Sequence, residues 1–156
     1  MVFWYNPRMK LRIAFLILAA VWTAGVTQSS LGAQAAAAPA PRTVWDGVYT
    51  DAQAERGAEV YKSACSECHG ADLAGDGFAP ALTGSEFAGN WNELSVGDLF
   101  ERIRVSMPPT GPSTVTPAQK ADIVAHIMKF NKYPAGTTEL ESKTDVLKLI
   151  KIEMKK

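Results

Sequence analysis

The feature that most constrains this chain is the pentapeptide Cys65-Ser66-Glu67-Cys68-His69, whose cysteines are the only two in 156 residues. The C-x-x-C-H spacing is the signature of covalent haem attachment. Two thiols three positions apart at the end of a helix reach both vinyl-derived carbons on one porphyrin edge. The next residue then lies under the ring, where its imidazole can bind the iron. The motif predicts one haem c, attached through Cys65 and Cys68, with His69 as an axial ligand.

Three other interpretations of the motif compete with haem attachment. A thioredoxin-like redox dithiol belongs in a βαβ setting, and no such pattern surrounds the motif. A structural zinc ion takes four ligands, and His126 is the only other His or Cys that could join the three in the motif. A chance match is the third alternative, and it leaves the rest of the composition unexplained.

The residue on the other side of the iron decides what the haem does. The candidates are Met107, Met128, Met154 and His126. Met107 is favoured because the two prolines after it fix an extended backbone and reduce the entropy of holding the thioether in place. Met128 falls at the edge of an apolar helix stripe, where methionine is typical of core packing. His126 falls on the other flank of that stripe, which is typical of a half-exposed helix histidine, and Met154 is near a terminus.

A methionine ligand limits the iron to outer-sphere electron exchange and raises its reduction potential. The sequence therefore predicts an electron carrier and not an enzyme. The alternative is an open sixth position, as in a ligand-binding or peroxidase-like haem protein. Such a protein needs a distal acid or hydrogen-bond donor, and His126 is the only histidine left for that role.

The N-terminus has the pattern of a cleaved export signal. Arg8, Lys10 and Arg12 precede an apolar run over residues 13–26, and small residues follow. We predict a signal peptide over residues 1–35, and hence a periplasmic or otherwise exported protein. The alternative is a retained membrane anchor, although the run is shorter than the ~20 residues that a spanning helix needs.

The remainder divides into three parts. Residues 36–43 are rich in Ala and Pro and predict a spacer, residues 44–136 predict the folded domain, and residues 137–156 form a C-terminal extension. This extension could be a strand, a helix or a tail that covers the core, and its lysines and apolar residues could also dock a partner. After removal of the signal the chain is mildly acidic, which argues against nucleic acid as a partner.

Helix signals recur along the predicted domain. A capping box at Thr50 begins a helix that runs toward Cys65, and Ser95 begins another that must end before Pro108. Thr116 caps a third helix, with Pro117 at its first position. Residues 70–92 lack helical or strand periodicity and predict a long ordered loop that wraps something. The expected fold class is all-α, with three to four short helices and long loops around one haem, and no sheet.

The sequence resembles the class I cytochrome c family. The resemblance covers about residues 44–131. It rests on the attachment motif, the segment after it, the Met-Pro pair at residues 107–108, and the first and last helices. The matching positions are Cys65, Cys68, His69, residues 80–82 and Met107-Pro108. It implies that Pro80 supplies the carbonyl that orients His69, and that Trp91 donates to a haem propionate. It also implies a close crossing of the first and last helices at Gly57 and Tyr61.

Three shorter segments, 44–49, 96–103 and 131–136, are similar to cytochrome modules found with quinoprotein dehydrogenases. Those enzymes oxidise alcohols or sugars with pyrroloquinoline quinone (PQQ) and pass electrons to a cytochrome. The similarity implies redox proteins as partners, with a PQQ-dependent dehydrogenase as donor and a respiratory acceptor. A permanent subunit of a larger dehydrogenase is the alternative to a free carrier.

Overall fold

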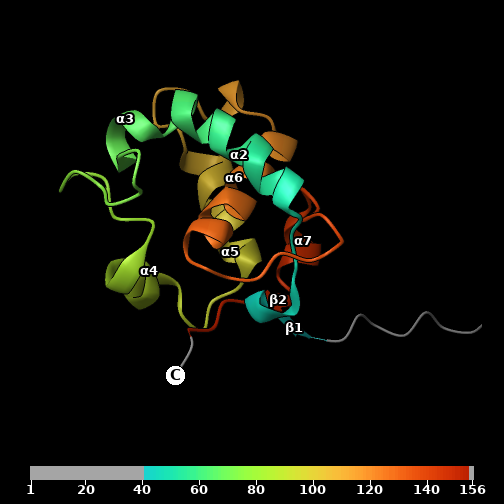
Figure 1. The fold of residues 1–156 in the computed structure, drawn as a ribbon. Helices are drawn as coiled ribbons and strands as arrows, with labels where there is room; N and C mark the ends of the chain where they lie inside the picture. The colour runs from blue at the N-terminus through green and yellow to red at the C-terminus, as the bar shows by residue number, and fades with distance from the viewer. Residues whose placement is uncertain (1–40, 155–156) are drawn as a thin grey trace, which may run out of the picture. The chain divides into compact units, whose positions relative to one another are not determined.

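The computed structural model describes residues 41–154, which fold as a mostly helical domain with four main helices (Figure 1). The signal peptide predicted over residues 1–35 lies outside the described residues. The elements in chain order are β1 (Arg42–Thr43), η2 (Val44–Asp46), α2 (Asp51–Ala64), α3 (Ser66–His69), α4 (Gly84–Trp91), α5 (Val96–Ser106), η3 (Pro112–Thr114), α6 (Pro117–Phe130), α7 (Thr144–Leu147) and β2 (Ile150–Lys151). The all-α class is confirmed. No helix within residues 41–154 has the length and hydrophobicity needed to cross a membrane.

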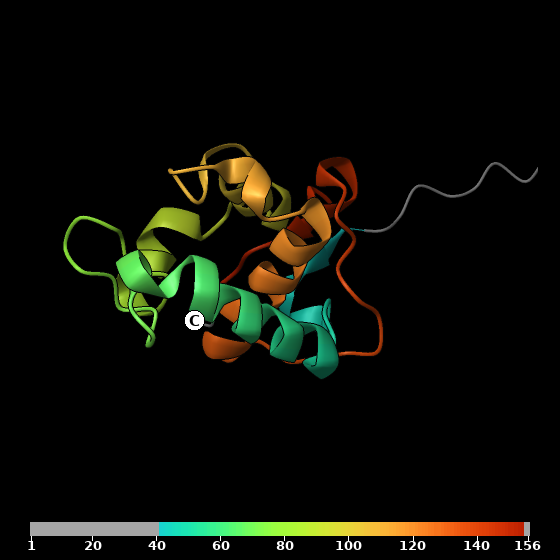
Figure 2. The same cartoon turned by 90° about the horizontal axis from the view of Figure 1, so that it is seen from above.

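Helices α2 and α6 cross closely in the centre of the domain, as two views at right angles show (Figures 1 and 2). The crossing depends on Gly57, because a Cβ atom there would lie 1.9 Å from the carbonyl oxygen of Asp122. Only glycine leaves room for so close an approach of two backbones. The predicted start of α6 is confirmed: Thr116 and Gln119 form a capping box and Pro117 is the first helical residue.

Only half of the predicted capping box at Thr50 forms. The Thr50 hydroxyl accepts a hydrogen bond from the backbone N–H of Gln53 at 3.1 Å. The Gln53 side chain does not return to Thr50 but is buried against the C-terminal extension. Its Nε2 donates to the carbonyl of Leu140 at 3.0 Å, and its Oε1 accepts from the Leu140 N–H at 2.8 Å. The Gln53 side chain, which the sequence pattern assigns to a capping box, therefore ties Leu140 of the C-terminal extension to α2.

The prediction of a continuous loop over residues 70–92 is wrong, because α4 occupies Gly84–Trp91. Two turns of helix are too short for a 3.6-residue period to be visible in the sequence. Phe87 is fully buried and Trp91, four positions later, is partly buried against the core. This single i, i+4 pair anchors α4. Residues 70–83, which precede α4, do form the expected irregular loop.

The expectation of no sheet is also wrong in one detail. β1 and β2 pair in parallel, with Arg42 opposite Ile150 and Thr43 opposite Lys151. Strands of two residues are too short to produce a visible alternation of polar and apolar residues. Among the described residues, regular structure thus begins at Arg42, inside the predicted spacer.

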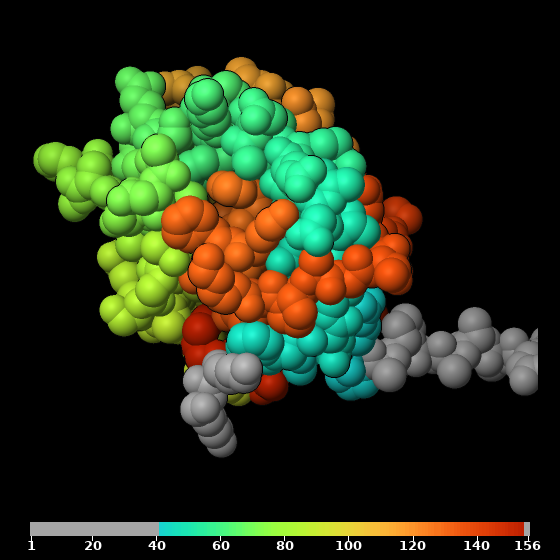
Figure 3. Space-filling view, viewed as in Figure 1, coloured from blue at the N-terminus to red at the C-terminus, as the bar shows by residue number. Residues whose placement is uncertain are grey.

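The C-terminal extension covers the core and includes both a helix and a strand. In the space-filling view the orange segment after α6 lies beside the blue-green start of α2 (Figure 3). Farther along, α7 and β2 pack against α5. The buried apolar residues of the extension are Leu140, Leu147, Ile150 and Ile152.

Replacing Gln53 by leucine is expected to lower the free energy of unfolding by about 2 kcal/mol. The variant leaves the N–H and the carbonyl of Leu140 without their partner, and each such loss costs about 1–3 kcal/mol, offset in part by the apolar side chain. Denaturant unfolding of the haem-loaded protein measures the change. Lys62→Leu, at an exposed position of the same helix, is the matched control. An equal effect of the two substitutions would contradict the role assigned to Gln53.

Candidate haem site

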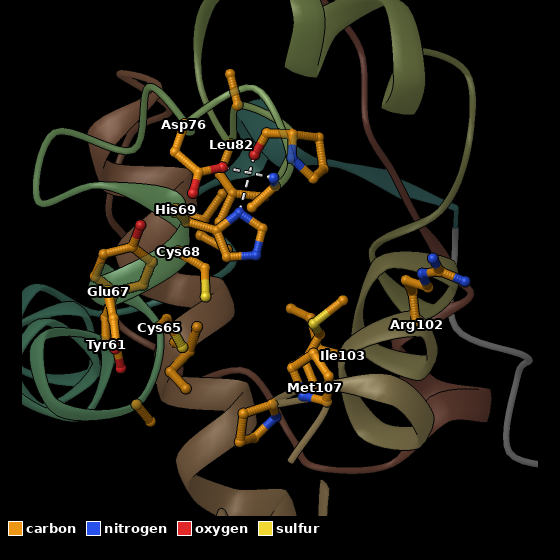
Figure 4. Close-up of a pocket in the computed structure, with 18 of the residues that line it drawn as sticks. Tyr61, Cys65, Glu67, Cys68, His69, Asp76, Leu82, Arg102, Ile103 and Met107 are labelled. Atoms are coloured by element: carbon orange, nitrogen blue, oxygen red, sulfur yellow. Dashed lines mark hydrogen bonds between the residues drawn. The ribbon is translucent and has the colours of Figure 1, made fainter. Parts of the chain in front are cut away.

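A cavity of about 530 Å³ lies between α2, α3, α4, α5 and α6. Figure 4 is a close-up of this cavity, with labelled side chains from α2, α3, α5 and the 70–83 loop around it. Its lining is largely apolar. All of the site residues predicted from the sequence line it, namely Cys65, Cys68, His69, Pro80, Trp91 and Met107.

Cys65 and Cys68 are held by the junction of two helices. Cys65 closes α2, donating its N–H to the carbonyl of Tyr61 at 2.9 Å, and begins α3, accepting at its carbonyl from His69 N at 3.0 Å. This single helical turn brings both thiols to one wall of the cavity beside His69 (Figure 4). Burial, together with the nearby Cys68, raises the pKa of the Cys65 thiol to about 11. A redox dithiol normally has a thiol whose pKa is lowered, so this environment argues against that alternative.

His69 is buried, with 8% of its surface exposed, and its ring has a fixed orientation. The ring Nδ1 lies 2.9 Å from the carbonyl oxygen of Pro80. A carbonyl can only accept, so Nδ1 carries the proton and Nε2 keeps its lone pair. This is the arrangement of metal-binding histidines, whose second nitrogen donates to a backbone carbonyl. Nε2 is therefore available to an iron in the cavity.

The loop that presents the Pro80 carbonyl is itself fixed by Asp76. One carboxylate oxygen of Asp76 accepts from the N–H groups of Phe78 at 2.9 Å and Ala79 at 2.7 Å. These two hydrogen bonds lower the pKa of Asp76, so the carboxylate stays ionised and the turn stays closed at neutral pH. Asp76 is not among the residues predicted from the sequence, although the Asp76-Gly77 dipeptide is a recognised turn signal.

Met107 ends α5 and faces the cavity from the side opposite His69 (Figure 4). Its N–H donates to the carbonyl of Ile103 at 3.0 Å, which is the last helical bond of α5. Its own backbone is extended, with φ −124° and ψ 139°, as expected for a residue before proline. Pro108 and Pro109 continue along the cavity wall.

The other candidates for the sixth ligand lie elsewhere. Met128 is fully buried in the core, and the Met154 sulfur accepts a hydrogen bond from the Tyr133 hydroxyl at 3.2 Å. His126 packs on Tyr61, with ring centroids 5.2 Å apart, and does not line the cavity. Among the described methionines, Met107 alone does so. Nor does any group of three or more His, Cys, Asp or Glu in residues 41–154 have metal-binding geometry.

Trp91 lines the cavity from the end of α4, with its ring centroid 6.5 Å from that of Phe87. Two further residues line the cavity: Arg102, which was not identified from the sequence, and Tyr61, which the resemblance placed at the crossing of the first and last helices. Arg102 of α5 lines the cavity as an exposed basic residue. The Tyr61 hydroxyl donates to the carbonyl of Gly70 at 2.8 Å and so secures the end of α3.

Comparison with known families agrees with this site. Residues 52–127 match the family described as Cytochrome C oxidase, cbb3-type, subunit III. Searches among curated proteins and among solved structures gave no match. The chain thus contains a cytochrome c domain at residues 52–127, and its helical fold is consistent with that of cytochrome c. Such domains carry covalent haem c, transfer electrons and are typically carriers and not enzymes.

The residues around the cavity fit a haem c group. The thiols lie on one wall, His69 offers an unprotonated nitrogen, and Met107 offers a thioether from the opposite side. The volume is within the ~300–1,000 Å³ of pockets that enclose a small molecule or cofactor. Cys65 and Cys68 would hold the group, and His69 and Met107 would bind its iron.

Proposed function

We propose that this protein is an exported one-electron carrier with a single haem c whose iron has two protein ligands, His69 and Met107. The observation that carries the proposal is the placement of these two side chains on opposite sides of one cavity that also contains both cysteines. If both residues bind the iron, they would leave it no position for a substrate. Export is proposed from the signal sequence predicted over residues 1–35.

The protein side chains determine how the site works. Haem supplies a one-electron couple between ferric and ferrous iron. Pro80 fixes the His69 ring and increases its basicity through the hydrogen bond to Nδ1. Met107 contributes a soft sulfur, which favours ferrous iron and raises the reduction potential. The apolar lining excludes water and so disfavours the additional charge of the ferric state. With haem bound, Trp91 would donate to a propionate, as the resemblance implies, and Arg102 would attract one by its charge.

The resting spectrum tests this proposal. The wild-type protein is expected to be low-spin and six-coordinate in both oxidation states, and its ferrous form is expected to bind carbon monoxide slowly, because Met107 must first leave the iron. Stopped-flow mixing with carbon monoxide measures this rate. A high-spin ferric spectrum with rapid carbon monoxide binding would instead indicate the alternative, an open ligand-binding or peroxidase-like site.

For partners we propose redox proteins on both sides of the carrier. The resemblance of three short segments to modules of PQQ-dependent dehydrogenases supports a dehydrogenase as donor. The matched family's description names a cytochrome c oxidase subunit, which supports a respiratory acceptor. It also supports the second candidate, a subunit held in a larger complex. Size-exclusion chromatography of native extract separates the two, because a free carrier elutes near its own mass.

A further inference from the structure

Lys120 is a buried cation close to the proposed ligand Met107. It lies on α6 with 2% of its surface exposed, although lysine is almost never fully buried without partners. Its Nζ donates to two backbone carbonyls, that of Arg104 at 3.0 Å and that of Pro112 at 2.6 Å. Helix α6 is in turn fixed against α2 by the close crossing at Gly57.

The two carbonyls bracket the segment that carries Met107. We call residues 105–111 the methionine strap. Arg104 is in the last turn of α5, where carbonyls lack a helical donor, and Pro112 begins η3. Within the strap the backbone bonds are local, with Gly111 N donating to Pro108 O at 3.1 Å. The ammonium of Lys120 therefore joins both ends of the strap to one rigid helix.

An ammonium suits this position for two reasons. It offers three donors on one atom, so it can serve two carbonyls from different segments at once. Its positive charge also interacts favourably with the C-terminal end of the α5 dipole. A neutral apolar side chain would leave both of these part-buried carbonyls without this donor.

We propose that Lys120 is a positioning residue for the sixth ligand: by holding both ends of the methionine strap, it keeps the Met107 sulfur at the iron. The inference depends on the proposed ligation by Met107. Without Lys120 the strap has more conformations available, and the sulfur competes less well with water or an added ligand for the iron.

Lys120→Met tests the proposal in the haem-loaded protein, because it removes the ammonium and keeps the length of the side chain. Imidazole competes with Met107 for ferric iron. The affinity of the Lys120→Met variant for imidazole is expected to rise about tenfold or more, because the hydrogen bonds from a charged group are lost. The far-red sulfur-to-iron band should weaken and the reduction potential should fall. Lys120→Arg, which keeps charge and donors, should restore much of the band.

Lys129→Met is the matched control, since Lys129 is on α6 but exposed and paired with Asp51 at 2.8 Å. Imidazole affinity within twofold of wild type in Lys120→Met, with an unchanged band, would overturn the proposal. If that variant does not mature, the same criterion applies to Lys120→Gln, whose shorter amide is uncharged. A wild-type protein without the band would instead refute Met107 ligation itself, so the two failures are distinguishable.

Discussion

A chain in which Cys65 and Cys68 are both replaced by alanine is expected to contain no covalent haem and little stable helix. The cavity of about 530 Å³ lies between the main helices of the domain, and its lining is largely apolar. Without haem these side chains face water, which costs roughly 25 cal/mol per Å² of apolar surface and offsets part of the ~5–15 kcal/mol that stabilises a domain. Haem staining after denaturing electrophoresis and far-ultraviolet circular dichroism measure the two effects.

Ser66→Ala is the control for this experiment, since Ser66 lies between the two cysteines and is not expected to attach haem. It should mature normally and keep its haem under denaturing conditions. The account would be contradicted by a double-alanine chain that still carries haem through denaturation. A haem-free chain that unfolds cooperatively would contradict the part of the account in which haem completes the core.

Helix positions were predictable because their signals are local. Each start depends on a side chain that bonds a backbone N–H three residues away, as at Ser95 with Asp98 and at Thr116 with Gln119. Proline then fixes the other limits: α5 ends directly before Met107-Pro108, and α6 begins at Pro117. These interactions need no knowledge of the rest of the fold.

The features that the sequence did not predict depend on contacts between distant segments. Helix α4 forms because Phe87 and Trp91 meet the core, and β1 pairs with β2 across more than a hundred residues. Gln53 has the pattern of a capping residue but bonds Leu140, 87 positions away. Propensity and periodicity carry no information about such pairings, so tertiary contacts override the local signal.

The residues of the site also fall into those that local sequence predicts and those that only the fold brings together. Cys65, Cys68 and His69 are adjacent in sequence, so their chemistry follows from spacing alone, and Met107 could be ranked first from its prolines. The supporting residues could not be found in this way. Lys120 has the sequence context of a solvent-exposed helix lysine, and only the fold brings its ammonium to the carbonyls of Arg104 and Pro112.

The second large effect is expected from Met107→Ala. Removing the thioether leaves the sixth position of the iron to water or an added ligand, which makes the ferric form largely high-spin. The reduction potential should fall by on the order of 0.1 V or more, within the roughly 0.8 V range that axial ligands span, because the soft sulfur no longer favours ferrous iron. Carbon monoxide should bind the ferrous variant rapidly. Met154→Leu, at a methionine outside the cavity, is the control and should change none of these properties.

The most direct test of the carrier function is the far-red absorption of the ferric protein, where a weak sulfur-to-iron band reports methionine ligation. The account predicts that wild type and Met154→Leu have this band and that Met107→Ala loses it while turning high-spin. Identical spectra for wild type and Met107→Ala would contradict the account, because Met107 would then be structural and the sixth position would be open or filled by another residue.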